Sequence, residues 1–482
     1  MLAIAGLLAF GVTACKDDGT PDGLDLDNPR LDPKYCESCH PTHYREWLGS
    51  MHAYAAEDPV FLAMNARGQR ETNGALGDFC VNCHAPLAVR MGLTTDGLNL
   101  PELPQQVRGV TCYFCHTVES VDGTHNNPLT LAGNSVMLGA IRDPVDNEGH
   151  SSAYSVLLAS ATMESGDMCG TCHDIVTDAG VHLETTYAEW QTTFFADTAP
   201  LSGGPAIYGL RCGNCHMGPG ETGTIADAPG VKADRVRHPH AMPAVDVALH
   251  DWPDATLGPQ LRAEQEEAIA FLRKSALCST VCVNPDGAGG SNVDVYLHNE
   301  FAAHAWTSGA SQDRRAWLEV EAFEGGTSRF AIGPVPEGQP VAEFDAPDMW
   351  RIRDYLYDEA GNEVHMFWEA RSKDGETLPP SEMLSPMGDA STWRVRRFNV
   401  PDATVDRVTS RLRLRPVGLD VLDSLIESGD LDPAVRDAMP VFDVEPAVLE
   451  WTPETAETFD DYGPCVSSSS VCGAPIIGAP LP

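Results

Sequence analysis

The feature that most constrains this chain is a five-residue pattern, Cys-x-x-Cys-His, that occurs five times. Two cysteines three positions apart with an adjoining histidine are typical of c-type haem attachment. The chemistry explains the spacing, because two thiols add across two vinyl groups on one porphyrin edge while the neighbouring imidazole binds the iron. The motifs are Cys36, Cys39 and His40; Cys80, Cys83 and His84; Cys112, Cys115 and His116; Cys169, Cys172 and His173; and Cys212, Cys215 and His216.

Two other uses of paired cysteines fit this pattern less well. A zinc protein would combine Cys-x-x-Cys pairs into four-ligand sets, which leaves the five adjacent histidines without a role. A thioredoxin-like dithiol needs one such pair within a βαβ pattern, not five along the chain. The sequence therefore predicts five covalently bound haems c, with iron as the metal and the five motif histidines as proximal ligands.

The segment 31–285 carries all five motifs and has little sustained hydrophobic periodicity. Because so few residues surround each haem, we expect the porphyrins to form the core of a pentahaem cytochrome domain that is mainly α-helical or irregular. Short helices should carry the ligands, one of them around 151–161. A helix with apolar residues at helical spacing is expected over 261–276 and should close the domain.

After about residue 285 the pattern changes to short, often alternating segments rich in Val, Phe, Trp and Arg. Such segments predict β-strands, here over 292–301, 314–323, 327–333, 363–371, 392–400 and 406–416. Their number and spacing predict an all-β immunoglobulin-like sandwich domain over 286–455. One amphipathic helix over 418–431, ending at Gly429, should interrupt it. The tail, 456–482, is expected to be loose apart from a disulfide.

The N-terminal segment predicts export. Residues 1–15 are apolar, too short to span a bilayer and end in small residues, as secretory signal peptides do. The ending Val-Thr-Ala-Cys resembles a bacterial lipobox, so we expect Cys15 to be the lipidated first residue of the mature chain. An ordinary secreted protein with an unused cysteine is the alternative. Residues 16–30 are rich in Asp, Gly and Pro and predict a flexible tether.

Four cysteines remain after the haem cysteines and Cys15 are set aside. An even number in an oxidising compartment predicts two disulfides, with three connectivities open. The local pairs are the first choice, Cys278 with Cys282 and Cys465 with Cys472.

The charge of the chain is strongly negative, with 70 acidic and 31 basic residues. Nucleic acid and anionic membrane surfaces are poor partners for such a chain, whereas cationic redox proteins or metal ions suit it better. Solubility in salty surroundings would explain the charge equally well. We expect redox partner proteins or extracellular electron acceptors, membrane contact through the lipid anchor, and a membrane complex or oligomer as a further option.

Successive blocks over 34–250 resemble the multihaem cytochromes c related to the nitrifier tetrahaem cytochrome and hydroxylamine-oxidoreductase group. The blocks are "CESCHPTHYREWLGSMHAYAAEDPVF", "CVNCHAP", "GVTCYFCHTV", "CGTCHDI", "LETTYAEW", "CGNCHM" and "HPHAMPAVDVAL". The resemblance implies distal iron ligands at the histidine of W-x-x-S-x-H, at the histidine after the third motif's Asp-Pro segment, and at the H-x-H before "VD". In this chain these are His52, His150, and His238 or His240.

A further block beyond residue 250, "NEFAAHAWTSGASQDRRAWLEV", is similar to one that often follows these haem domains. Ala303 and Thr307 stand where that block has Gly and Pro. The similarity implies that His304, from the second domain, ligates an iron. His125 is a further candidate ligand.

Other residues near the motifs are expected to have supporting roles. His43 should hydrogen-bond a haem propionate, and Trp47 and Trp190 should pack against porphyrin faces. Three histidines are expected to be structural, namely His182, His298 and His365.

The sixth ligand of each iron decides what such a protein does. A strong-field ligand makes an electron carrier, and an open position allows catalysis. Eleven of the 16 histidines lie outside the motifs, which is enough for five irons. We therefore expect bis-histidine ligation, no catalytic residue, and a lipid-anchored electron carrier in the periplasm, at the outer membrane or at the cell surface. The alternatives are an oxidoreductase of nitrogen or sulfur compounds with one open iron, and a conduit or filament subunit.

Overall fold

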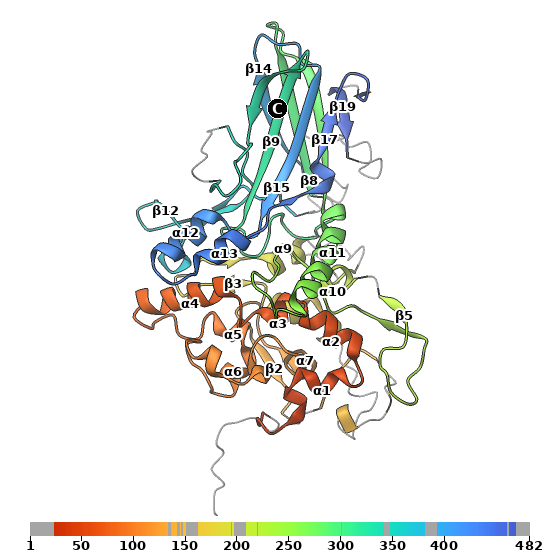
Figure 1. The fold of residues 1–482 in the computed structure, drawn as a ribbon, viewed down its shortest axis with the longest axis vertical. Coiled ribbons are helices and arrows are strands. Elements are labelled where there is room, and N and C mark those ends of the chain that lie inside the picture. The colour runs from red at the N-terminus through yellow and green to blue at the C-terminus, as the bar shows by residue number, and fades with distance from the viewer. Residues whose placement is uncertain are drawn as a thin grey trace, which may run out of the picture.

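The computed structural model describes two successive regions, the first made of short helices and the second of long strands (Figure 1). The fold class expected from the sequence, a helical and irregular part followed by a sandwich of sheets, is confirmed. The signal segment 1–15 with Cys15 and the expected helix at 151–161 lie outside the described residues. The structure describes residues 24–133, 136–141, 145, 148–150, 162–193, 195–196, 209–218, 220–299, 301–341, 348–380, 393–459 and 462–468.

The first region consists of short helices and two-stranded hairpins. Its α-helices are α1 (Pro33–Glu37), α2 (Pro41–Leu48), α3 (Met51–Tyr54), α4 (Pro59–Glu71), α5 (Val81–His84), α6 (Pro86–Arg90), α7 (Cys112–His116), α8 (Gly166–Gly170), α9 (Thr186–Thr192) and α10 (Cys212–His216). The hairpins pair β1 (Val118–Val121) with β2 (Leu129–Leu131), β3 (Ile175–Val176) with β4 (His182–Glu184), and β5 (Glu221–Gly223) with β6 (Arg235–Arg237). Short 3-10 turns lie between them, at Pro29–Leu31, Leu100–Glu102, Gln105–Val107, Glu148–His150 and Thr162–Glu164.

Side-chain caps start many of these helices. The side chains of Asp32, Ser50 and Asp58 each accept a hydrogen bond from a backbone N–H in the first turn of α1, α3 and α4. Proline then occupies the start of α1 and α4, where its missing N–H costs nothing. Helices of one or two turns are not stable alone in water. Their stability therefore depends on what they pack against.

Helix α11 (Gly258–Ala276) connects the two regions and leads directly into strand β7 (Leu277–Pro285). The helix expected over 261–276 is confirmed, with an additional turn at its N-terminal end. Its interior residues Leu261 and Ile269 are buried.

The second region is a sandwich of two five-stranded antiparallel sheets. One has the order β10-β9-β15-β16, with β17 also paired to β15, and the other the order β14-β8-β7-β19-β18. A smaller sheet has the order β12-β11-β13. The strands after β7 are β8 (Ser291–Asn299), β9 (Arg315–Glu324), β10 (Thr327–Ile332), β11 (Asp354–Tyr357), β12 (Glu363–Val364), β13 (Ser372–Gly375), β14 (Trp393–Val400), β15 (Arg407–Arg415), β16 (Phe442–Asp443), β17 (Leu449–Trp451), β18 (Glu457–Phe459) and β19 (Gly463–Ser467).

One apolar core lies between the two large sheets. Val281 and Val295 reach it from one sheet, and Leu318, Val320 and Leu412 reach it from the other. The sequence predicted strand β15 because its buried residues alternate with partly exposed ones. The sandwich can therefore exclude water with its own side chains.

The sandwich begins earlier and ends later than the boundaries 286 and 455 expected from the sequence. Strand β7 pairs with β8 along its whole length, and β18 and β19 from the expected loose tail complete the same sheet. Strand β7 is buried along most of its length and therefore does not alternate. A central strand that contains two cysteines, a serine and a threonine lacks the apolar run by which buried strands are recognised.

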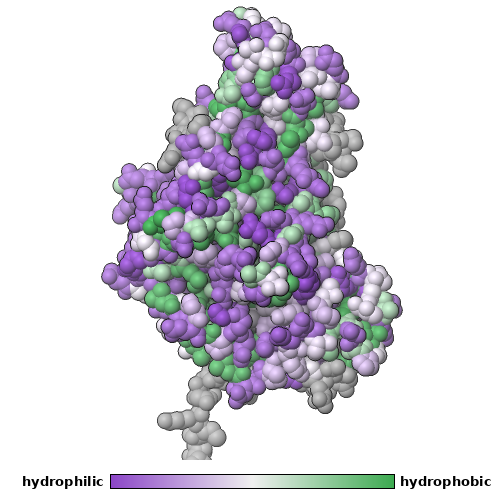
Figure 2. Space-filling model, viewed as in Figure 1, coloured by the Kyte–Doolittle hydropathy of each residue, from purple (hydrophilic) through white to green (hydrophobic). Residues whose placement is uncertain are grey.

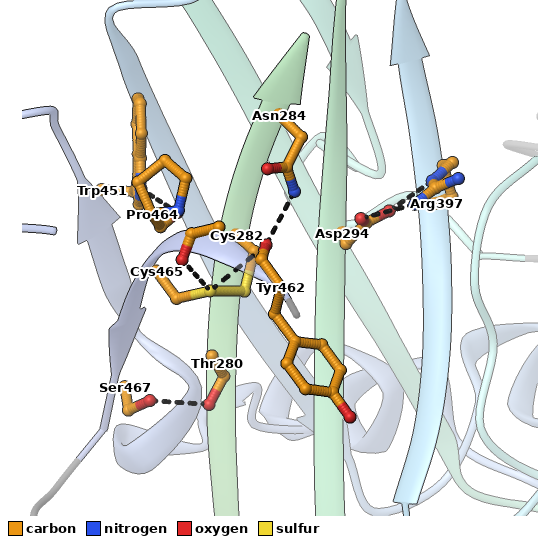
Figure 3. The surroundings of a disulfide bond; sticks show 11 residues. Thr280, Cys282, Asn284, Asp294, Arg397, Trp451, Tyr462, Pro464, Cys465 and Ser467 are labelled. Atoms are coloured by element: carbon orange, nitrogen blue, oxygen red, sulfur yellow. Dashed lines mark hydrogen bonds and ion pairs between the residues drawn. A yellow bond between two sulfur atoms is a disulfide. The ribbon is translucent and has the colours of Figure 1, made fainter. Parts of the chain in front are cut away.

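The disulfide connectivity also differs from the first choice. Cys282 on β7 is bonded to Cys465 on β19, in register across the two strands (Figure 3). Cys278 is disulfide-bonded as well, and Cys472 lies outside the described residues. A local Cys278–Cys282 bond is excluded because four residues of extended strand separate these Cα atoms by about 13 Å, roughly twice a disulfide's reach.

One of the expected strands, 363–371, is a strand only at Glu363–Val364, and a 3-10 turn follows at Phe367–Glu369. The turn leads Phe367 and Trp368 onto the helical region, where the Phe367 ring lies 5.5 Å from that of Phe79. The aromatic residues that suggested a strand therefore lie at the interface between the two regions. The expected amphipathic helix is confirmed as α12 (Leu419–Glu427), followed by Gly429 at a φ of 80° and by α13 (Pro433–Ala438).

The described part of the expected tether 16–30 packs on the helical region. Leu24 and Leu31 are buried in the core of the helical region, and Arg30 donates a hydrogen bond to the Gly149 carbonyl at 2.9 Å. Two isolated leucines among polar residues show no helical or strand periodicity. The sequence therefore did not predict that this segment packs on the helical region.

The face of the molecule in Figure 2 is mostly hydrophilic over both regions, in agreement with the high charge of the chain. Among the described residues, no helix is both long and apolar enough to cross a bilayer.

Candidate haem-attachment sites

Each of the five motifs occupies one short helical turn. The backbone N–H of the motif histidine donates to the carbonyl of the first cysteine at 2.8 Å for His40 and 3.3 Å for His84 and His173. The other two motifs lie within α7 and α10. Residues three and four positions apart share one helix face, so the two thiols and the imidazole of each motif lie on one side.

Close packing fixes the fourth motif against its neighbour α9. A Cβ atom on Gly170, between Cys169 and Cys172, would lie 2.0 Å from the Tyr187 ring. Only glycine therefore allows α8 to approach α9 at this point. Tyr187 in turn donates a hydrogen bond from its hydroxyl to Asp167 at 2.5 Å.

Four of the five motif histidines are oriented in the same way. The Nδ1 atom of each contacts a backbone carbonyl oxygen from another segment, which fixes the ring and leaves Nε2 to bind a metal. For His173 no such bond is found in the described part of the chain. The four contacts are His40 to Ile225 at 2.9 Å, His84 to Ala55 at 2.9 Å, His116 to Leu138 at 2.8 Å and His216 to Pro243 at 2.7 Å.

A second histidine from elsewhere in the chain faces four of the motif histidines. Each pair has ring centroids about 6 Å apart. The pairs are His40 with His150 at 6.0 Å, His173 with His52 at 6.2 Å, His116 with His240 at 6.3 Å and His216 with His304 at 6.3 Å.

The separation of these rings fits two ligands of one metal ion. Imidazoles bonded at about 2.0 Å on opposite sides of one ion place their centroids about 6.3 Å apart, since each centroid lies about 1.1 Å behind its nitrogen. The donor set of two thiols and one histidine per motif, with a second histidine opposite, therefore fits covalent haem c at these four sites. In the described part of the chain, no three His, Cys, Asp or Glu side chains converge as a bare metal site would require.

The second histidines are held by contacts of the same kind as the first. The Nδ1 atoms of His240 and His304 contact the carbonyl oxygens of His238 at 2.9 Å and Ala305 at 2.7 Å. The Nδ1 atom of His52 lies 3.0 Å from the Met242 sulfur. Each contact occupies Nδ1 and leaves Nε2 available to bind a metal.

Burial keeps these imidazoles neutral, which is the form that binds a metal. Desolvation, together with the neighbouring imidazoles, lowers the pKa of His52 to about 4 and that of His173 and of His240 to about 3. Burial also lowers the pKa values of the other motif histidines for which a shift is resolved, namely His84, His116 and His216.

The second motif differs from the other four. Among the described residues, no second histidine ring faces His84. Instead the Phe61 ring stacks on the His84 ring, with centroids 4.0 Å apart and planes 5° apart. Because a metal bonded to Nε2 lies in the plane of the imidazole, Phe61 covers a face of the ring and does not occupy the position opposite.

The remaining expected residues lie as follows. His125 is exposed and contacts Thr124, and no ring contact joins it to a motif histidine in the part of the chain described. His43 lies between sites, with its ring 5.6 Å from that of His40 and 4.8 Å from that of His240. Trp47 and Trp190 are buried and donate to the carbonyls of Val110 and Leu210. Their roles as haem contacts stay predictions.

The loop that carries His304 is fastened to the helical region by Glu189 on α9. The Glu189 carboxylate accepts hydrogen bonds from the Ala305 backbone N–H at 3.0 Å and the Ser308 hydroxyl at 2.8 Å. The Ser308 hydroxyl also contacts Thr186 at 2.7 Å. These contacts hold a histidine of the sandwich against the fifth motif.

The thiols of different motifs meet in pairs, although the motifs are far apart in sequence. Hydrogen-bond contacts join Cys36 to Cys112, Cys83 to Cys172, and Cys169 to Cys212. The first motif therefore adjoins the third, and the fourth adjoins both the second and the fifth.

Sequence reasoning did not single out Phe61 or Glu189. Both lie in quoted blocks, "EDPVF" and "YAEW", but nothing in either block marks an aromatic ring that will stack on a ligand or a carboxylate that will fasten a loop. Only the folded chain brings them to their partners.

Two comparisons with known proteins agree with this geometry. The family model described as Cytochrome c554 and c-prime matches residues 35–117, which span the first three motifs. Among solved structures, the fold is similar to that of a penta-heme cytochrome c552 from Thermochromatium tepidum, with a TM-score of 0.58, 21% sequence identity, and coverage of 88% of this chain and 99% of that one. No curated protein matches the chain. The five motifs and the family match over three of them support covalently bound haem c, and the solved structure shows that the chain shares the fold of a penta-heme cytochrome.

Proposed function

We propose that this chain is an exported pentahaem cytochrome c that carries electrons between redox partners of the cell envelope. The observation that carries the proposal is the set of four histidine pairs with ring centroids 6.0–6.3 Å apart. Two imidazoles on one iron leave no position for a substrate, which suits a carrier and not a catalyst.

The residues of the chain have three tasks in this function. The motif cysteines would hold each haem and the motif histidine would bind its iron, with a second histidine available at four of the five sites. The carbonyl contacts fix the rings so that little rearranges when the charge changes. The haem supplies one-electron redox chemistry when bound. Burial of the histidines keeps them neutral and keeps water from the metal.

The thiol contacts between motifs support a continuous relay. The cysteines attach to the edges of the haems, so neighbouring thiols bring two haem edges together. The contacts Cys36–Cys112, Cys83–Cys172 and Cys169–Cys212 link the first site to the third and the fourth site to the second and fifth. The thiol of Cys115 also lies near those of Cys169 and Cys172, which connects the two groups.

A location outside the cytoplasm suits the chemistry of the chain. The Cys282–Cys465 disulfide supports this location, because disulfides form and persist mainly in oxidising compartments. A lipid on Cys15 would keep the protein at a membrane, and its acidic surface would favour cationic redox partners. A Cys15→Ala variant would then move from the membrane to the soluble exported fraction.

A second function is favoured by one observation at His84, which faces no second histidine among the described residues. A haem held there would have a free axial position, where a small nitrogen or sulfur compound could bind and be oxidised or reduced. The second candidate is therefore an oxidoreductase with four carrier haems and one reactive haem.

Mass spectrometry and electron paramagnetic resonance test both functions. The denatured mature chain should carry the mass of five haems, and the oxidised protein should show four low-spin haems and one high-spin haem. The His52–His173 pair, with ring planes 72° apart, should give the most anisotropic low-spin signal. A chain with fewer than five haems contradicts the carrier proposal, and five low-spin haems contradict the oxidoreductase.

A further inference from the structure

Helix α4 contacts the His84 site with one face and the sandwich with the other. Phe61 points from α4 to the His84 ring, whereas Val60 and Ala63 are buried in a cluster with residues of α12 and α13. Figure 1 shows α12 and α13 between the long strands and α4. The sandwich therefore adjoins the His84 site through α4, in addition to the contact of Phe367 with Phe79 next to Cys80.

The His84 ring is fixed from two directions by the segment 55–61. Its Nδ1 atom contacts the Ala55 carbonyl at 2.9 Å, and its face stacks on Phe61 at 4.0 Å. The carbonyl fixes the tilt of the ring, and the stacked ring fixes its rotation about the axis of its metal bond. Ala55 and Phe61 lie on either side of the N-terminus of α4 and move with this helix.

The sandwich holds α4 through polar contacts as well as through apolar packing. Arg70 forms a bidentate ion pair with Asp430, with N–O distances of 2.5 and 2.6 Å. Arg67 donates to the Ser424 hydroxyl at 2.8 Å. Both arginines are on α4, and both partners lie on or directly after α12.

Trp368 of the sandwich completes this interface by lying directly on α4. Its indole N–H donates to Glu71 at 3.1 Å. A Cβ atom on Gly68 would lie 3.0 Å from the Trp368 ring and 2.6 Å from the Leu76 side chain. A glycine on this face of the helix is therefore needed for Trp368 to approach.

We propose that α4 is a positioning element through which the sandwich sets the ligand affinity of the His84 haem. This inference rests on the proposed haem at His84 with a free axial position. Phe61 is the positioning residue at the metal ligand, and the contacts of Arg70 and Trp368 hold the helix that carries it. Residues that orient a metal ligand commonly change affinity or activity by about 10- to 100-fold when replaced.

Substitution of Phe61 tests the first half of the proposal. In the reduced Phe61→Leu protein, the iron–histidine vibration of the five-coordinate haem should shift in resonance Raman spectra, and cyanide affinity of the oxidised protein should change by about tenfold. Phe61→Tyr keeps the stacked ring and should restore both values. Phe330→Leu, in an aromatic pair of the sandwich, is the matched control and should change neither.

Substitutions that weaken the contact between the sandwich and α4 test the second half of the proposal. Arg70→Gln and Gly68→Ala should each move the vibration and the cyanide affinity in the same direction as Phe61→Leu, by a smaller amount. Arg45→Gln removes the ion pair of a similarly exposed arginine with Glu264, within the helical region, and should have no effect.

The outcomes separate this inference from the proposed function. A wild-type protein with a five-coordinate haem whose vibration is the same in Phe61→Leu overturns the positioning role and leaves the function intact. A shift in Phe61→Leu without one in Arg70→Gln and Gly68→Ala overturns the role of the sandwich. A wild-type protein without any five-coordinate haem overturns both the inference and the free position at His84.

Discussion

The two regions of this molecule have cores of different composition. The sandwich packs Val, Leu and Trp side chains from two sheets into one cluster. The helical region combines an apolar cluster with half-buried imidazoles and thiols that face one another, for example His116 with His240 and Cys36 with Cys112. The comparison teaches that the sandwich can fold on its own side chains, whereas the helical region depends on haem to complete its core.

This difference also explains why the chain needs a link between the regions. A haem that is the core of its domain also serves as an attachment point, since any histidine that reaches its iron becomes part of that core. His304 lies on the sandwich side and faces His216 at 6.3 Å. We therefore predict that His304 joins the sandwich to the helical region through this iron.

The largest effect should come from removal of one haem. In Cys112→Ala/Cys115→Ala, the third haem cannot attach, and we expect the helical region to lose its compact structure because Tyr113, Phe114 and their neighbours pack around it. Mass spectrometry should find at most four haems, and limited proteolysis should cleave 31–276 while the sandwich persists. A doubly substituted protein whose helical region resists protease as the wild type does would contradict the dependence on haem.

A smaller effect is expected from a cavity in the other core. Trp317 is 1% exposed in the apolar cluster of the sandwich, so Trp317→Ala should reduce the free energy of unfolding of the sandwich by about 3–5 kcal/mol. The absorption spectrum of the first four haems should stay unchanged. Val236→Ala, at an exposed position in the helical region, should change stability by less than about 0.5 kcal/mol. Loss of several haems in Trp317→Ala would show that the regions do not fold separately.

The boundary between the regions should show a pH dependence. Burial is the main cause that raises the pKa of Glu184 on β4 from 4.5 to about 7, against Arg314 and Lys373 of the sandwich and with Asp313 and Asp246 nearby. Because the folded chain binds this proton more tightly than the unfolded chain, the contribution to stability is full below pH 4.5 and is lost as pH rises through 7. The loss amounts to at most about 3 kcal/mol.

Glu184→Gln keeps the shape and removes the titration. The urea midpoint of the variant should therefore fall less than that of the wild type between pH 5 and pH 8. Glu221→Gln, whose side chain is 75% exposed, is the control and should follow the wild type. Equal pH dependence in Glu184→Gln and the wild type would show that Glu184 is not buried as a neutral acid.

The sequence predicted most of the chemistry and the fold class, because both are local patterns. The motif spacing is set by one helical turn and one porphyrin edge, and β15 alternates because one of its faces is buried. The facing positions of His52, His150, His240 and His304 agree with what the family resemblance implied, although their binding of iron stays a prediction.

The incorrect predictions concern segments whose structure is set by tertiary contacts. Strand β7 was assigned to the wrong region because a central strand does not alternate, and its Cys282 pairs with a strand 183 residues away. The aromatic run at 363–371 indicated a strand, but Phe367 and Trp368 leave the sheet for the helical region. No sequence pattern shows that His84 stacks on Phe61, because that contact depends on how α4 is held.

The most direct test of the link between the regions is electron paramagnetic resonance of the oxidised His304→Ala protein. With the His304 imidazole removed, the haem at His216 loses its second histidine, so one further haem should become high-spin while the others stay as in the wild type. His298→Ala, which removes another histidine of the sandwich, stacked on Trp393 at 4.3 Å, should leave the spectrum unchanged. An unchanged number of low-spin haems in His304→Ala would contradict the claim that a histidine of the sandwich completes the haem core.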